Sequence, residues 1–155
     1  MYAYAEAMKI TGNSFHADVI AGIFSYLKRE LRSSQGGYFS AEDADSEGEE
    51  GKFYVWSLEE IQQSFDDPLE VKWLISAYQI SEAGNFEGAN ILQRQKSDAE
   101  LAEEFQVPIE TVPERLASLH RKLNQAREKR VRPGLDDKVL VSWNAFALRA
   151  FAEAG

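Results

Sequence analysis

Apolar residues recur at helical spacing through much of the chain. After a break at Thr11–Ser14, the apolar positions fall on one face with a period near 3.6 residues: Val19, Ile20, Ile23, Phe24, Leu27 and Leu31. This pattern predicts an amphipathic helix over 14–33, preceded by a shorter helix. Gly36-Gly37 is a typical end for the longer one.

Capping signals predict further helices. Ser57–Glu60, Ser97–Glu100 and Thr111–Glu114 have the form of capping boxes, and Asp67-Pro68 places a cap before a proline at the first helical position. We therefore expect helices over 58–65, 68–78, 98–105 and 112–130, and a last one that starts near 139–142. The predicted fold class is mainly α, with paired antiparallel helices and one or two small β-hairpins.

Two aromatic runs flank an acidic loop. Tyr38–Ser40 and Lys52–Trp56 are rich in strand-forming residues, so we expect them to pair as a hairpin with the loop at its tip. Further along, Gly84–Gly88 predicts a turn, and 90–93 a short strand.

The loop itself carries six carboxylates and no base over residues 42–50. Such charge density is unfavourable unless the loop extends into solvent or faces a cation or a polar ligand. Asp43-x-Asp45-x-Glu47 matches the opening of an EF-hand loop, but its twelfth position is Tyr54 rather than the required glutamate, which excludes an EF-hand. A looser divalent-cation site and a solvated acidic turn remain as alternatives.

Composition narrows the classes of partner and compartment. The net charge of −9 argues against a nucleic-acid partner, and the absence of cysteine excludes disulfides and thiolate sites. No apolar run reaches the roughly 20 residues that span a bilayer, so we expect a cytoplasmic protein without a membrane partner. Both ends have helical composition, which predicts a piece of a longer protein.

A second dense polar patch covers 136–144. Asp136 and Asp137 precede a predicted helix, where they either cap it or line a cleft together with Lys138. Paired carboxylates serve glycoside hydrolysis, and exposed aromatic faces suit sugar rings, although aromatics more often fill cores. The basic run at 121–132 is interpreted as a solvated helix face rather than a phosphate site, and His16 and His120 as structural residues.

Taken together, these motifs resemble the spermatogenesis-associated protein 20-like (thioredoxin-domain-containing) proteins. The resemblance rests on Gly36–Gly48, Gly51–Trp56, Gly84–Gly88, Arg132-Pro133 and Asp136–Lys138 with Trp143-Asn144, in the family's order and over most of the chain. It implies an N-terminal thioredoxin-like domain followed by a helical region similar to the (α/α)6 toroids of six-hairpin glycosidases and N-acylglucosamine epimerases. The chain would be a single fragment, 1–155, of that toroid.

From this fold analogy we expect a carbohydrate-like small-molecule ligand, and a glycosidase- or epimerase-like role in the full-length protein if it is an enzyme. The competing hypothesis is a non-enzymatic helical scaffold. We expect no cofactor and no metal, and a fragment that self-associates through uncovered helix faces. The candidate acid/base residues are Asp43, Asp45, Asp136 and Asp137. The candidate ligand contacts are Trp56, Asn85, Glu87, Lys138, Trp143 and Asn144.

Overall fold

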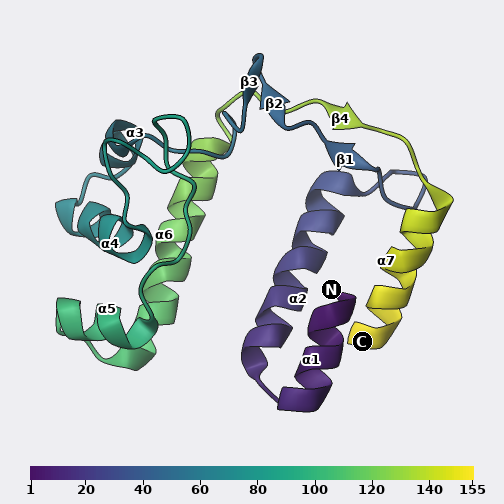
Figure 1. Cartoon of the computed structure of the whole chain (residues 1–155), viewed down its shortest axis with the longest axis horizontal. Helices are drawn as coiled ribbons and strands as arrows, with labels where there is room; N and C mark the ends of the chain where they lie inside the picture. The colour runs from purple at the N-terminus through teal and green to yellow at the C-terminus, as the bar shows by residue number, and fades with distance from the viewer. The chain divides into compact units, whose positions relative to one another are not determined.

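The computed structural model describes all residues from 1 to 155 and is mainly helical (Figure 1). Seven α-helices are accompanied by two short antiparallel strand pairs. The chain divides into two compact units. Unit 1 comprises residues 1–43 and 134–155, and unit 2 comprises residues 44–133. No helix is both long enough and apolar enough to cross a bilayer.

Unit 1 contains three α-helices and one strand pair. Gly12, with φ of 66°, ends the first helix, and the Asn13 side chain caps the second by accepting a hydrogen bond from the Phe15 N–H at 3.0 Å. The first two helices form a hairpin, and the first also contacts the last (Figure 1). The elements are α1 (Tyr2–Thr11), α2 (Ser14–Tyr26), the π-helical turn η1 (Leu27–Leu31), β1 (Ala41–Glu42), β4 (Leu135–Asp136) and α7 (Val141–Ala154).

Unit 2 contains the other four α-helices and the second strand pair. Its longest helix, α6, runs beside the shorter ones (Figure 1). The elements are β2 (Asp45–Ser46), β3 (Glu49–Glu50), α3 (Leu58–Gln63), α4 (Pro68–Tyr78), α5 (Asp98–Phe105), the 3-10 turn η2 (Ile109–Thr111) and α6 (Val112–Arg127).

The hydrophobic core of the molecule lies in unit 2. One continuous cluster joins side chains from α3, α4, α5 and α6, and Ile61, Leu74, Leu101 and Leu119 are completely buried within it. The Trp73 indole stacks on the Phe105 ring with centroids 4.0 Å apart. Four helices that each supply an apolar stripe thus enclose a core of their own.

Unit 1 buries far less. Its buried apolar residues are Ala5, Leu31 and Ala150, and α2 has none. On α7, Val141 and Leu148 are 85% and 69% exposed although they lie seven residues apart on one face. The helices of unit 1 therefore pack on one side and leave large apolar side chains in solvent on another.

The helix predictions are confirmed to within a few residues. The capping boxes of Ser57 and Ser97 form as expected. The third predicted box was wrong: Thr111 makes no cap bond to the helix, because its hydroxyl donates to the Pro108 carbonyl at 2.7 Å within η2.

The predicted hairpin between 38–40 and 52–56 was also wrong. The acidic loop forms its own small hairpin, β2–β3, while Tyr38 bridges to Arg32 and Trp56 to Asn90. The strand partner of β1 is β4, more than 90 residues away. In the predicted 90–93 strand, only Asn90 takes part in a bridge, whereas the 84–88 turn is closed by a Phe86–Ala89 bridge.

Candidate functional site

The β1–β4 pair joins the two polar segments of unit 1 that the sequence singles out. Ala41 pairs with Asp136, and the Asp43 N–H donates to the Gly134 carbonyl at 2.7 Å. Ser40 adds two bonds to the Asp136 carbonyl, from its N–H at 3.2 Å and its hydroxyl at 3.1 Å. Asp43 and Asp136, distant in the chain, therefore lie on neighbouring strand ends.

Asp136 is held as a carboxylate by Lys138. The Lys138 ammonium donates to both carboxylate oxygens, at 2.5 and 2.6 Å, and these bonds lower the pKa of Asp136 below its usual value. A group with a lowered pKa is ionised at neutral pH. It accepts hydrogen bonds well, but it is a weaker base than an ordinary carboxylate and holds no proton to donate.

Asp43, Asp137 and Trp143 stay at the surface of unit 1. All three are exposed, and the Trp143 residue keeps 54% of its area in solvent. An exposed indole close in sequence to carboxylates offers a flat apolar face next to hydrogen-bond acceptors.

Asn144, the remaining candidate of unit 1, acts as a clamp on the backbone. Its side chain accepts from the Tyr38 N–H at 2.7 Å and donates to the Tyr38 and Leu140 carbonyls, each at 3.0 Å. The clamp also explains Gly37, which has φ of 83° and whose added Cβ would stand 3.2 Å from the Asn144 Oδ1. The amide thus ties α7 to the segment before β1.

Asp45 belongs to unit 2, unlike Asp43. It pairs with Glu50 in the β2–β3 hairpin, where Lys52 neutralises part of the charge through Glu49 at 2.7 Å and Glu47 at 3.6 Å. No group of three or more histidine or acidic side chains in the chain is arranged to hold a metal ion. The candidate cation site in the acidic loop is therefore not formed here.

Trp56 is buried, with 4% exposure, under Arg130. The guanidinium carbon lies 4.1 Å from the indole centroid, and its Nη1 donates to the carbonyls of Lys52, Phe53 and Val55 at 3.2, 3.0 and 2.7 Å. Arg130 therefore departs from the solvated basic face that the charge run predicts. Charge counting alone gives no signal for such an inward turn.

Asn85 and Glu87 lie in the 84–88 turn of unit 2. The Asn85 side chain binds the N–H and the carbonyl of Ile91, at 2.7 and 3.0 Å, and Glu87 is exposed at a positive φ of 47°. The sequence reasoning missed Asn90, which is only 2% exposed. Its side chain accepts from the Ser81 N–H and donates to the Ser81 and Trp56 carbonyls, each at 3.0 Å.

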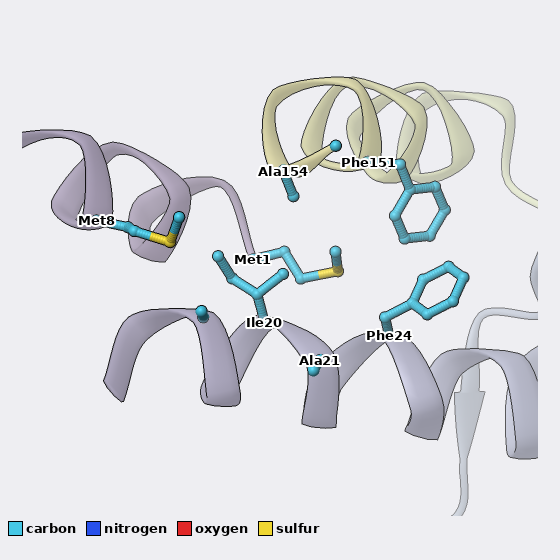
Figure 2. A pocket seen from close by; sticks show the side chains of 9 residues that line it. Met1, Met8, Ile20, Ala21, Phe24, Phe151 and Ala154 are labelled. Atoms are coloured by element: carbon cyan, nitrogen blue, oxygen red, sulfur yellow. The ribbon is translucent and has the colours of Figure 1, made fainter. Parts of the chain in front are cut away.

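Unit 1 also contains an apolar pocket of about 370 Å³ (Figure 2). Phe24 of α2 and Phe151 of α7 point toward each other, with ring centroids 5.4 Å apart, and Met1, Met8 and Ile20 border the same space. None of the candidate acid/base or ligand-contact residues predicted from the sequence lines it.

Comparison with known proteins finds relatives that match almost the whole chain. No family model matches the chain. It is 35% identical to spermatogenesis-associated protein 20 of Homo sapiens over 99% of the chain, and 35% identical to that of Mus musculus over 98%. An uncharacterized Caenorhabditis elegans protein is 26% identical over 88% of the chain. The chain spans 22% of the length of each of these relatives. The resemblance expected from the motifs is thereby confirmed: over this segment the chain is similar to spermatogenesis-associated protein 20.

Proposed function

We propose that the chain is one segment of a larger (α/α)6 toroid and that unit 1 contributes a polar edge which binds a carbohydrate-like ligand. The observation that carries this proposal is the β1–β4 pairing, which holds Asp43 and Asp136 on neighbouring strand ends. In toroids of this kind the connections at one end of the helices line the cleft. We infer that the β1–β4 pair is one of these connections.

We assign different roles to the side chains of this edge. Asp136, kept ionised by Lys138, would accept hydrogen bonds from sugar hydroxyls and stabilise positive charge that develops on the ring. The proton donor of a glycosidase- or epimerase-like reaction would then be Asp43 or Asp137. Trp143 would pack its indole on the apolar face of a sugar ring. Asp45, Trp56, Asn85 and Glu87 lie in unit 2 and are not needed for this edge.

Titration calorimetry with glucose, mannose and N-acetylglucosamine tests the proposal. We expect saturable binding of at least one sugar to the chain, and a loss of at least about tenfold in affinity in Asp137→Asn and in Trp143→Ala. Asp45→Asn is the matched control, because it removes one carboxylate of the acidic segment in the other unit. Absence of binding to all three sugars, or binding that survives both unit 1 substitutions, would contradict the proposal.

A non-enzymatic helical scaffold is the second candidate, and the outer face of α7 favours it. Val141, Ala145, Leu148 and Ala152 are exposed at positions i, i+4, i+7 and i+11, which makes an apolar stripe along one helix face. Exposed stripes of this kind mark contact surfaces. If the chain is a scaffold, the stripe packs against a neighbouring helix, and the isolated chain self-associates through this stripe.

Sedimentation velocity tests the scaffold hypothesis. The chain should form dimers or larger species at tens of micromolar concentration, and the double variant V141E/L148E should be monomeric. Asp137→Asn, which leaves the stripe intact, should associate like the unchanged chain. A monomeric wild-type chain at high concentration would contradict self-association through α7.

A further inference from the structure

A second pocket, of about 340 Å³, lies wholly within unit 2 and is independent of the polar edge of unit 1. Trp56, Leu92 and Leu123 provide its apolar walls. Its polar residues include three on one face of α6, at positions 120, 124 and 127, and the spacing i, i+4, i+7 directs them to the same side. The size falls at the lower end of the range of small-molecule sites.

Two of the polar residues satisfy each other. The Tyr78 hydroxyl and the His120 Nε2 share a short hydrogen bond, and Tyr78 is only 7% exposed. Burial raises the pKa of Tyr78 and lowers the pKa of His120. Both groups are therefore uncharged at neutral pH, and the pair gives the pocket a polar wall without net charge.

The side chains of Arg127 and Asn124, in contrast, can still form further hydrogen bonds. The Arg127 Nε is buried and has no hydrogen-bond acceptor, and no carboxylate pairs with this guanidinium. Its neighbours are aromatic: the guanidinium carbon lies 5.4 Å from the Phe53 ring centroid and 5.5 Å from that of Tyr54. Aromatic rings stabilise a cation but do not accept strong N–H bonds. The Asn124 side chain makes no bond within the protein.

We propose that this pocket binds a small organic monocarboxylate. Its carboxylate accepts hydrogen bonds from Arg127 and Asn124, while its apolar body lies against Trp56 and Leu92. A planar guanidinium fork matches the geometry of a carboxylate. Arg127 is the one permanently charged residue lining the pocket, so a single carboxylate neutralises it, and the apolar walls favour a ligand with an apolar body over inorganic phosphate.

Proton–nitrogen correlation NMR of the full 155-residue chain tests this assignment. The probes are sodium benzoate and sodium 4-methylvalerate, one planar and one branched, and benzamide is the uncharged match to benzoate. We expect both carboxylates to give saturable shifts at the Trp56 indole N–H and at the amides of Leu92 and 120–127. Benzamide and inorganic phosphate should bind at least about tenfold more weakly.

Three variants sharpen the test. Arg127→Gln removes the charge, and Asn124→Asp introduces a repelling carboxylate at an exposed helix position that tolerates substitution. Each should weaken carboxylate binding at least about tenfold. Arg121→Gln, on the same helix but paired with Glu114 outside the pocket, should bind like the unchanged chain. If Arg127→Gln does not fold, the affinity of Asn124→Asp for benzoate alone decides the test.

The proposal is overturned if neither carboxylate gives a saturable shift, or if benzamide or phosphate binds as tightly as benzoate. It is equally overturned if folded Asn124→Asp binds benzoate as tightly as the unchanged chain. None of these results depends on whether unit 1 binds a sugar, so the two proposals fail separately.

Discussion

The two units use the same kind of helix in different ways. In unit 2, the apolar stripes of α3 to α6 meet in one cluster, and its largest side chains, such as Trp73, are almost completely buried. In unit 1, three helices bury only small parts of their apolar faces, and Val141 and Phe146 remain 85% and 69% exposed. Amphipathic helices alone thus do not make a core; a core needs partners on every apolar face.

Each unit also contains an asparagine whose side chain hydrogen-bonds to main-chain groups and so clamps the backbone. Asn90 in unit 2 and Asn144 in unit 1 each make three hydrogen bonds to main-chain groups. Asn90 is 2% exposed, whereas Asn144 is only partly buried. Water replaces lost bonds more readily at the second site, so the same chemistry should stabilise the two units to different extents.

The largest difference is expected from one substitution made in both units. Leu74→Ala in α4 removes a completely buried side chain and should lower the free energy of unfolding by about 2–5 kcal/mol. Leu148→Ala in α7 removes a side chain that is 69% exposed and should change it by less than about 0.5 kcal/mol. Urea unfolding followed by circular dichroism measures both; equal effects would contradict the contrast between the units.

A smaller difference is expected from the two asparagines. Asn90→Ala removes three side-chain hydrogen bonds and leaves the Ser81 N–H without a partner, while the Trp56 and Ser81 carbonyls keep one main-chain bond each. It should cost about 2–3 kcal/mol of stability. Asn144→Ala should cost about 1 kcal/mol, because solvent reaches the groups that it frees. The same urea titrations report both values. A larger loss of stability in Asn144→Ala than in Asn90→Ala would contradict the expectation that the more buried asparagine stabilises the chain more.

The smallest effect should be a pH dependence that is confined to unit 2. The pKa of His120 in the folded chain lies below its ordinary value of 6.5, chiefly because of burial against Tyr78. As the pH falls below 6.5, the unfolded chain therefore binds a proton that the folded chain does not, and stability decreases until the lower folded pKa is passed. Proton NMR of the imidazole gives the midpoint. His120→Gln should remove this part of the pH dependence, and a midpoint above 6.5 would contradict it.

The sequence predicted the helices well because their signals are local. The Ser57 and Ser97 capping boxes and the Asp67-Pro68 start each act within four residues, and the structure confirms them. The strands were mispredicted because β1 is two residues long and pairs with a segment more than 90 residues away. Neither alternation nor turn chemistry can indicate such a partner.

The candidate site was predictable only in part, for a related reason. Pattern reasoning marked Asp43 and Asp136 as members of two polar patches, and the β1–β4 pair does bring these two residues to neighbouring strand ends. It could not tell a surface amide from a clamp such as Asn144, nor a solvated arginine from Arg130, which donates to three carbonyls. That distinction depends on which groups the rest of the fold leaves unsatisfied.

Hydrogen exchange of the intact chain, followed amide by amide, tests the contrast between the units most directly. We expect the slowest amides to lie in α4 and α6, around Leu74 and Leu119, and those of α2 and α7 to exchange much faster. Protection in α2 and α7 equal to that in α4 and α6 would show that unit 1 has a core of its own, and it would contradict the account.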